Sequence, residues 1–385
     1  MGLELNINKK YRDFSLHVSI KTESKRIGIL GASGCGKTLT LKSVAGLVRP
    51  DEGMISVDGR VLYNSEDGTD IRAKNRDVGY LFQNYALFPH MTVEENIRTA
   101  LHGAGRRKSK AAVKTVDEIL ETFGISDIRN HRPSELSGGQ QQKTALARIL
   151  ACDPGVLLLD EPFSAMDTYI REGLRLELIR ILENYDKTVV MVSHDRDEIY
   201  QLCDHIVLMD EGRVIGQGDM DDVFNHPETP RVARLTGCQN ISRIERIDDH
   251  HLRALDWRGL ELTVDSKITD DIRYAGIRAH DFYPAKVSEY RRDDRCSSVS
   301  EMQYGDAPTS VDDLPESMAC VNCIPTGKID ISRLPFEWYV TLENGLWWKI
   351  PRELGSIRDE NTVPPYVCVE PKKILLMKAE MSYED

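Results

Sequence analysis

Eight residues, Gly31 to Thr38, constrain what this chain can fold into more than any other segment. They read Gly-Ala-Ser-Gly-Cys-Gly-Lys-Thr, the phosphate-binding pattern of a glycine, four residues and Gly-Lys-Thr. The apolar run 26–30 before them is typical of a buried strand, and residues 37–47 have the apolar spacing of a helix. Such a strand, loop and helix direct several main-chain N–H groups at one polyphosphate. The simpler alternative is a glycine-rich turn that binds nothing.

The chemistry of the loop assigns a role to each of its residues. The glycines allow positive φ and a close approach of the main chain to phosphate oxygens. We expect the Lys37 ammonium to lie against the β- and γ-phosphates and the Thr38 hydroxyl to bind Mg2+. The predicted nucleotide-binding residues of the loop are Gly31, Ala32, Ser33, Gly34, Cys35, Gly36, Lys37 and Thr38.

Length and charge narrow the class of protein. A chain of 385 residues predicts two domains. The net charge of -12 argues against a general nucleic-acid binder, which would present a basic face. We find no apolar run of about 20 residues and no signal-peptide layout, so we expect a soluble, cytosolic chain. The 8 cysteines have no framework spacing and are interpreted as mostly reduced thiols.

Composition changes near residues 236–240. From residue 240 onward there are 19 basic and 27 acidic residues, which gives -8 of the net -12. All 4 tryptophans, at 257, 338, 347 and 348, lie in this part. The shift predicts one domain at 1–236 and a second at 237–385.

Polar residues follow three strand-like runs of the first part. Gln83 follows the run 78–82, Asp160 and Glu161 end the run 156–159, and His194 follows the run 188–192. Buried strands alternating with helices predict a mostly parallel sheet with helices on both sides, whose strand ends bind ligands. Asp160 suits a second contact to Mg2+, and Glu161 suits the base that activates water. Each residue alone also fits an ordinary structural role, such as capping a helix.

Taken together, these segments resemble the ATPases of ABC transporters. The resemblance covers about residues 1–235 and rests on the loop 31–38, Gln83 as the Q-loop glutamine, Leu136-Ser137-Gly138-Gly139-Gln140 as the signature, Asp160-Glu161 as the end of Walker B, Ser164 to Asp167 as the D-loop, and His194 as the switch histidine. It implies an α/β P-loop domain with a mixed sheet and a helical subdomain. It also implies ATP and Mg2+ as cofactors, with Gln83, Glu161 and His194 catalytic and with Thr38, Gln83 and Asp160 at the metal.

The resemblance further implies partners. Two copies would meet head to tail, so that each ATP lies between one loop 31–38 and the Ser137, Gly138, Gly139 and Gln140 of the other copy. One signature in the chain implies a homodimer. Gln83 and the apolar loop 84–90 would contact an integral membrane permease, which an extracytoplasmic solute-binding protein supplies. The subunit would be peripheral, at the cytoplasmic face of the cell membrane, without a nucleic-acid partner.

Two side chains near the loop carry predictions of their own. Tyr11 lies upstream of the loop and could stack on an adenine ring, although packing against a strand is an equally good interpretation. Cys35 lies at a helix N-terminus beside a lysine, which predicts a lowered pKa and fast alkylation that MgATP suppresses.

The part from 237 to 385 reads as short strands and turns, which predicts an all-β, barrel-like domain. The polar stretch 287–318 is interpreted as a flexible insertion. Cys320 and Cys323 have zinc-like spacing. Because no second pair accompanies them, we expect no metal site there.

This part resembles, more loosely, the β-barrel regulatory extension of importer ATPases. The resemblance rests on segment 275–281, and segments 237–241 and 322–325 resemble the molybdate/sulfate branch. It implies uptake of an oxyanion, molybdate first, then sulfate or tungstate. The alternatives are an importer ATPase for a sugar, a polyamine or iron, and a soluble ABC ATPase outside transport.

Overall fold

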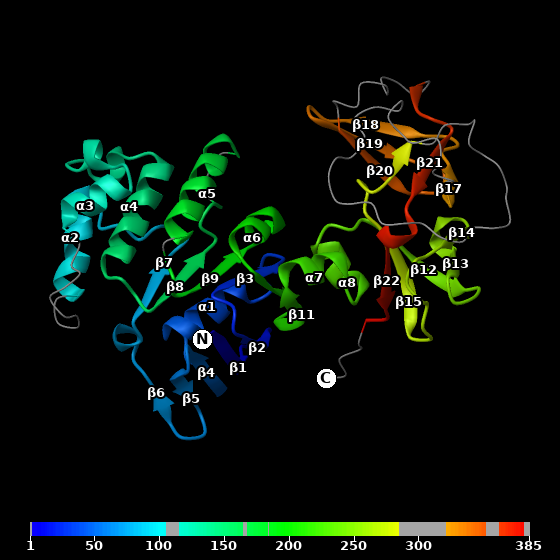
Figure 1. Cartoon of the computed structure of the whole chain (residues 1–385). Helices are drawn as coiled ribbons and strands as arrows, with labels where there is room; N and C mark the ends of the chain where they lie inside the picture. Colours follow the sequence, from blue (N-terminus) through cyan, green and yellow to red (C-terminus); the bar gives the residue numbers. More distant parts are fainter. Residues whose placement is uncertain are drawn as a thin grey trace. The chain divides into compact units, whose positions relative to one another are not determined.

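We describe the protein from a computed structural model of the whole chain (Figure 1). The structure describes residues 2–104, 115–164, 168–183, 185–284, 321–351 and 362–380, without the side chains of 102–104 and 168–170. The chain divides into two compact units, Met1–Asp221 and Asp222–Asp385. The domain boundary at 236–237 stays a prediction, and the proposed insertion 287–318 lies outside the described residues.

One large sheet organises the first unit. It has 11 strands, in the spatial order β6 (Thr69–Asp70), β5 (Arg60–Asn64), β4 (Glu52–Val57), β1 (Leu3–Lys10), β2 (Ser15–Thr22), β11 (Arg213–Asp219), β10 (His205–Asp210), β3 (Arg26–Gly31), β9 (Thr188–Ser193), β8 (Val156–Asp160) and β7 (Val78–Leu81).

Only half of this sheet is parallel. The strands β10, β3, β9, β8 and β7 pair parallel, whereas β6, β5, β4, β1 and β2 pair antiparallel. The mixed sheet that the family resemblance implies is therefore confirmed, whereas the expectation of a mostly parallel sheet was wrong. Tight turns cause the difference: Asp58 and Gly59, both with positive φ, join β4 to β5 directly and force antiparallel pairing.

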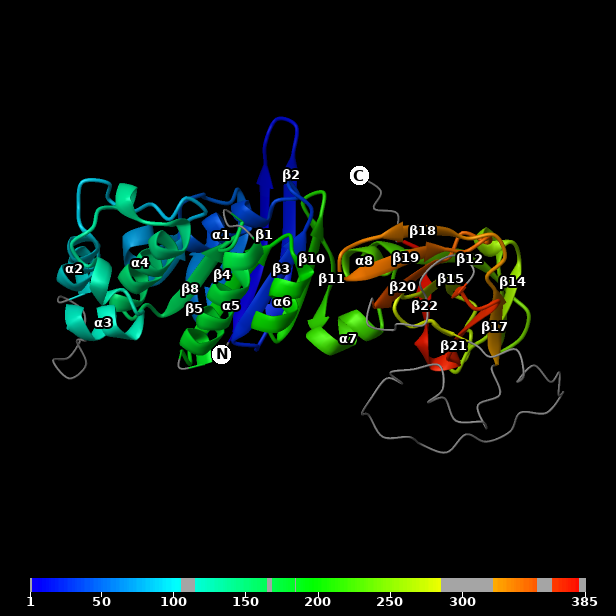
Figure 2. The ribbon, with the colours of Figure 1, turned by 90° about the horizontal axis from the view of Figure 1, so that it is seen from above.

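The helices of the first unit complete the mixed α/β architecture. They are α1 (Lys37–Ala45), α2 (Val93–Ala104), α3 (Val116–Thr122), α4 (Gly138–Ala151), α5 (Thr168–Glu183), α6 (Arg196–Leu202) and α7 (Met220–Asn225), which runs across the division between the units. Two views show α2, α3 and α4 grouped together, apart from α1 (Figures 1 and 2). Thr92 and Glu95 form a capping box at the start of α2. No helix in the described residues is long and apolar enough to cross a bilayer.

A shared hydrophobic core fixes α1 against the sheet. Leu41 and Val44 of α1 are buried together with Ile29 of β3, Leu158 of β8 and Val192 of β9. Because α1 follows the glycine loop at once, this packing sets where the loop lies relative to the ends of three parallel strands.

The described residues of the second unit contain three antiparallel sheets and α8 (Pro230–Leu235). The first sheet is β14 (Leu260–Thr263), β13 (His251–Ala254), β12 (Asn240–Arg246), β15 (Ile272–Ile277) and β22 (Ile374–Lys378). The second is β16 (Tyr283–Pro284), β21 (Tyr366–Val369) and β17 (Asn322–Pro325), and the third is β18 (Asp330–Arg333), β19 (Glu337–Thr341) and β20 (Trp347–Pro351). Leu252, Ile324 and Trp348 share one buried cluster, so the three sheets have a common core.

A buried arginine holds the carboxyl end of α1. Arg76 is 2% exposed and donates to the main-chain oxygens of Ser43 (2.7 Å), Val44 (2.9 Å) and Ile71 (2.6 Å). It also pairs with Asp70 at 3.2 Å. Three main-chain acceptors near the helix end therefore depend on one guanidinium.

We expect Arg76→Met to lower the free energy of unfolding of the first unit by about 3 kcal/mol, because three acceptors and one carboxylate lose their donor. Urea unfolding followed by circular dichroism measures the change. The matched control is Arg72→Met, at an exposed position, which should change the value by less than about 0.5 kcal/mol. Equal effects of the two variants would contradict the conclusion that Arg76 stabilises the end of α1.

Candidate active site

The glycine loop leaves β3 and enters α1 as the sequence predicts. Gly34 and Gly36 have φ of 85° and 105°. A Cβ at Gly36 would lie 2.6 Å from Leu16 Cδ1 and 3.1 Å from Phe14 Cζ. Position 36 therefore requires glycine for its main-chain conformation and also for its packing. Ala32, Ser33 and Gly34 are exposed at the crest of the loop, where a ligand could reach them.

Lys37 is held inside the curve of the loop. Its side chain is 4% exposed, and Nζ donates to the main-chain oxygens of Gly31 (2.8 Å) and Ala32 (2.9 Å). This places a cation at the N-terminal end of α1, where unpaired N–H groups and the helix dipole also favour an anion.

Thr38 and Asp160 meet as predicted. Thr38 Oγ1 donates to Asp160 Oδ1 at 2.8 Å, and Tyr80 Oη donates to Asp160 Oδ2 at 2.7 Å. Asp160 is 4% exposed, so these two hydroxyls serve a carboxylate that is nearly cut off from water. Burial and the bond to Asp160 raise the pKa of Tyr80, which keeps its hydroxyl protonated as a donor. Sequence reasoning missed Tyr80, and its place on the strand before Gln83 was the available signal.

The oxygen atoms of Thr38 and Asp160 fit Mg2+. A hydroxyl and a carboxylate are hard donors, and Mg2+ in nucleotide sites takes one or two such protein ligands together with phosphate oxygens. Within the described ranges there is no group of three His, Cys, Asp or Glu that could hold a metal by itself. A metal here would therefore need the phosphates of a nucleotide as further ligands.

Gln83, Glu161 and His194 come together at the ends of β7, β8 and β9. Gln83 Nε2 lies 3.3 Å from Glu161 Oε2 and 3.3 Å from Ser164 Oγ, and His194 Nδ1 lies 3.5 Å from Glu161 Oε1. Two of the three predicted catalytic side chains, Gln83 and His194, thus lie beside the carboxylate of the third, Glu161. The structure places the Gln83 amide nitrogen at Glu161, and a role for Gln83 at the metal stays a prediction.

The main chain fixes the direction of Glu161. Its φ is 46°, a left-handed conformation that is uncommon for a residue with a side chain, and its N–H donates to the Val192 oxygen of β9 at 3.0 Å. Asp160 and Glu161 consequently point to different partners although they are adjacent in the chain. Residues 165–167 of the predicted D-loop lie outside the described residues.

A second network supports the turn that carries His194. Ser193 Oγ donates to Glu198 Oε2 at 2.5 Å and accepts the Asp195 N–H at 2.9 Å. Burial raises the pKa of Glu198. These bonds tie the turn to the first turn of α6, and sequence reasoning did not identify them.

The signature segment opens α4. Ser137 caps the helix: its Oγ accepts the Gln140 N–H at 3.3 Å, and Gln140 Oε1 accepts the Ser137 N–H at 2.9 Å. The Gln140 side chain is therefore engaged within the cap. Ser137 and Gly138 are exposed, whereas Gly139 is buried. The capped N-terminus is favourable for an anion.

Tyr11 and Phe14 lie in the turn between β1 and β2 and differ in exposure. Tyr11 is 39% exposed, and Lys9 Nζ lies 5.7 Å from the centre of its ring. Phe14 packs on the core and against Gly36. The exposed ring of Tyr11 is the one that is open for stacking, and its role at an adenine stays a prediction.

The prediction of a lowered pKa for Cys35 was wrong. Its side chain is 5% exposed and belongs to the core beneath the sheet. Burial raises the pKa of the Cys35 thiol and outweighs the lowering effect of Lys37. Proximity to a helix N-terminus indicated a reactive thiol only because the direction of the side chain cannot be read from the pattern.

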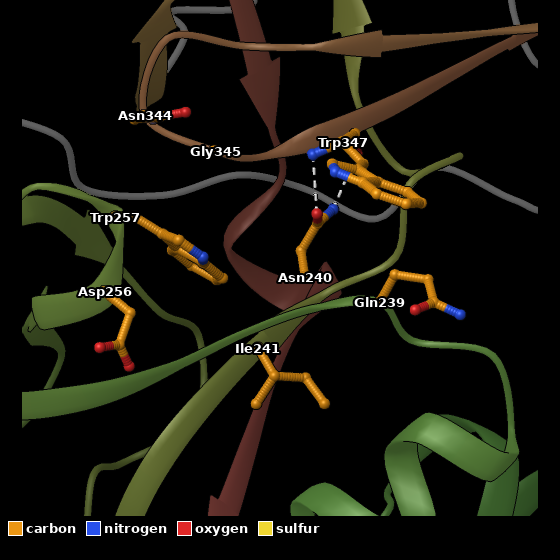
Figure 3. Close-up of a pocket in the computed structure, with 8 residues that line it drawn as sticks. All are labelled: Gln239, Asn240, Ile241, Asp256, Trp257, Asn344, Gly345 and Trp347. Carbon is orange, nitrogen blue, oxygen red and sulfur yellow. Dashed lines mark hydrogen bonds between the residues drawn. The ribbon is translucent and has the colours of Figure 1, made fainter. Parts of the chain in front are cut away.

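A second candidate site is a pocket of about 320 Å³ in the second unit (Figure 3). It is lined by Gln239, Asn240, Ile241, Asp256, Trp257, Asn344, Gly345 and Trp347. Asn240 fixes its wall, since Nδ2 donates to the Trp347 oxygen (2.8 Å) and Oδ1 accepts the Trp347 N–H (2.7 Å). Segment 237–241, which the sequence singled out, supplies three of the lining residues.

The charge of this pocket is internally balanced. Asp256 is paired with Arg243, whose side chain and main chain both donate to its carboxylate. Hydrogen bonds from Arg243 keep the pKa of Asp256 below its usual range. The remaining polar side chains of the lining, Gln239, Asn240 and Asn344, are neutral amides.

This arrangement defines an ATPase of the P-loop class, in which a glycine loop, a buried Asp and an adjacent Glu meet at the ends of parallel strands. A family model described as "ABC transporter" matches residues 13–164. The chain is 40% identical over 239 residues to the sulfate/thiosulfate import ATP-binding protein CysA of Gloeobacter violaceus, covering 61% of this chain and 67% of that protein. The chain belongs to the ATP-binding proteins of ABC transporters.

Other relatives are named for the same solute or for iron. The chain is 37% identical to the corresponding sulfate/thiosulfate protein of Synechocystis sp., where the match spans 65% of that protein's length. It is 38% identical over 253 residues to the Fe(3+) ions import ATP-binding protein FbpC of Brucella abortus, covering 65% of this chain and 70% of that protein. Among solved structures, the chain is similar to the dimeric structure of the ATP-binding cassette MJ0796 bound to ADP and Pi. The match covers 57% of this chain and 97% of the MJ0796 chain, at 27% identity and a TM-score of 0.46.

We expect Cys35 to alkylate at least about tenfold more slowly in the native protein than in the urea-unfolded chain, because burial disfavours its thiolate. Timed iodoacetamide labelling at pH 7.5, followed by peptide mass spectrometry, gives the two rates. If Cys35 were the fastest-labelled cysteine of the native protein, that result would support a lowered pKa for its thiol instead.

Proposed function

We propose that this protein is the ATP-hydrolysing subunit of an importer for a tetrahedral oxyanion. The observation that carries the ATPase part is the meeting of Gln83, Glu161 and His194 beside the Thr38–Asp160 pair, at the ends of four adjacent parallel strands. Brought together in this way, these side chains supply the parts that hydrolysis at a phosphate loop needs.

The loop binds the phosphates. The N–H groups at the start of α1 and the Lys37 ammonium would take the β- and γ-phosphate oxygens, with Lys37 exchanging its bonds to Gly31 and Ala32 for bonds to the nucleotide. Thr38 and Asp160 would hold Mg2+, which neutralises phosphate charge when bound.

Glu161 acts as the base. Its carboxylate accepts a proton from the water that attacks the γ-phosphate. His194 and Gln83, which lie on either side of it, orient that carboxylate and the water. The left-handed main chain at Glu161 keeps the base directed away from Asp160, so the two acids serve different roles.

A second copy of the chain completes the site. The exposed, capped N-terminus of α4 at Ser137 and Gly138 has N–H groups suited to a phosphate, and α4 groups with α2 and α3 apart from α1 (Figure 1). We therefore assign the signature to the ATP bound by the partner copy, which gives a head-to-tail homodimer.

The loop after Gln83 supplies a docking surface for a membrane permease. Arg148 of α4 donates to the main-chain oxygens of Tyr85 (3.1 Å) and Ala86 (2.8 Å). The Asn96 side chain of α2 accepts the main-chain N–H of Phe88 and donates to its main-chain oxygen. This support leaves the Phe88 ring 47% exposed. A rigid loop with an exposed aromatic group, attached to both Gln83 and the signature helix, can transmit the state of the ATP site to a partner.

The solute is inferred from the names of relatives and from two sequence segments. Relatives named for sulfate/thiosulfate and the segments 237–241 and 322–325 favour an oxyanion, molybdate first and sulfate or tungstate next. The relative named for Fe(3+) keeps iron as the second candidate. The subunit would work at the cytoplasmic face of the membrane, with a permease and, indirectly, a solute-binding protein. We assign the second unit, as a β-barrel-like extension, to regulation and dimer contact.

We expect Glu161→Gln to lower ATPase activity at least about 100-fold while ATP binding persists, because the base is lost and the loop is intact. The assay is phosphate release, together with equilibrium binding of a fluorescent ATP analogue. Glu172→Gln, at an exposed position of α5, is the matched control and should retain wild-type activity.

The same variant tests the homodimer. Glu161→Gln with ATP should elute as a dimer on size exclusion, and adding Ser137→Glu should return it to monomer because a carboxylate would face the phosphates. For the ATPase prediction, a Glu161→Gln protein that hydrolyses ATP at the wild-type rate would contradict the role of Glu161 as the base.

We expect molybdate to change the tryptophan emission in a saturable way, because two of the 4 tryptophans line the amide-rich pocket. The dissociation constant from this titration should be lower for molybdate than for sulfate. The titration uses the full chain without nucleotide. Trp338→Phe, outside the pocket, should keep the response, whereas Trp347→Phe should lose most of it. No response to any oxyanion would remove the sensing role and leave the ATPase assignment standing.

A further inference from the structure

Two cysteines of the second unit face each other across a pair of strands. Cys323 of β17 and Cys368 of β21 are direct partners in an antiparallel ladder. Their Sγ atoms lie 2.9 Å apart, although the residues are 45 positions apart in the chain. The fold, rather than local sequence, therefore brings these two thiols into contact.

The ladder geometry suits a covalent bond between them. Directly opposite residues of antiparallel strands have Cα atoms about 4.5 to 5.5 Å apart, which lies within the range of about 4.4 to 6.8 Å for a disulfide. Side chains of opposite residues project to the same face of the sheet. A disulfide could thus form with little movement of either main chain.

Exposure differs across the pair. Cys323 is half-buried, whereas Cys368 is buried in β21, the middle strand between β16 and β17. A small oxidant would reach Cys323 first, and Cys368 would be the thiol that resolves the product. In contrast, burial raises the pKa of Cys35, Cys203 and Cys238, which disfavours reaction at those thiols.

We propose that Cys323 and Cys368 are a dithiol site that a peroxide converts into a reversible disulfide. The Cys323 thiolate attacks one oxygen of hydrogen peroxide, the O–O bond breaks, and a sulfenic acid and hydroxide form. The Cys368 sulfur then attacks the Cys323 sulfur, the S–O bond breaks, and the leaving hydroxide takes the Cys368 proton. In total, two thiols lose two electrons and two protons, and one peroxide becomes two waters.

The disulfide would close a covalent loop of the chain that includes the third sheet. Strands β18, β19 and β20 all lie between Cys323 and Cys368 in the chain. Closing this loop restricts the unfolded chain, while the native strands are already paired. The disulfide should therefore stabilise the second unit, whatever the function of the first, so this inference does not depend on the proposed function.

The test uses the full chain treated with a small excess of hydrogen peroxide at pH 7.5. We expect the thiol titre to fall by two per chain, a tryptic map to contain the Cys323–Cys368 linked peptide, and dithiothreitol to restore both thiols. The unfolding midpoint, followed by tryptophan emission, should rise by roughly 5 °C or more in the oxidised form. Tryptophan emission is suitable because all 4 tryptophans lie in the second unit.

Serine variants separate this pair from other thiols. Cys323→Ser and Cys368→Ser should each abolish the linked peptide and the rise in midpoint, while Cys152→Ser, in the first unit, should abolish neither. The half-buried Cys323 position serves if the fully buried Cys368 position does not tolerate serine. Cys320→Ser should also leave the linked peptide intact.

Two results would overturn the proposal. One is a Cys320–Cys323 linked peptide in place of the Cys323–Cys368 peptide, since Cys320 is the nearer thiol in sequence. The other is an unchanged thiol titre, or only chain-to-chain disulfides, after a peroxide treatment that oxidises a small dithiol standard completely.

Discussion

The site depends on one nearly buried carboxylate, Asp160. The hydroxyls of Thr38 and Tyr80 both donate to it, one from the start of α1 and one from β7. An ionised carboxylate in such a place is stable only when donors surround it. These two bonds join the start of α1, the end of β8 and the strand that leads to Gln83. Loss of either donor would change the spacing between these three elements.

Sequence reasoning located the site because its residues follow strands that turned out to be parallel neighbours. Gln83, Glu161 and His194 are far apart in the chain, but the carboxyl ends of β7, β8 and β9 share one edge. Tyr80 was missed because its function arises from a contact 80 positions away. The error at Cys35 has the same origin: burial sets its pKa, and burial depends on tertiary packing that the loop pattern does not contain.

Prediction of the second unit was less complete for a physical reason. The sequence indicated short strands in this part, and the structure contains such strands, for example β19 and β20. The central strands β12 and β15 were not singled out, because arginines interrupt their apolar residues. Ladder register joins residues that are distant in sequence, so the contact of Cys323 with Cys368 follows from pairing and is invisible in the Cys320–Cys323 spacing.

Acidity of the second unit does not by itself exclude an anion from it. Many acids on β12 to β14 are matched locally: Asp256 pairs with Arg243, and Glu245 and Glu261 both pair with Arg253. Exposed charges beyond about 8 Å are largely screened at physiological ionic strength. A ligand in the pocket therefore responds to the Asp256–Arg243 pair and the neighbouring amides more than to the total charge of -8.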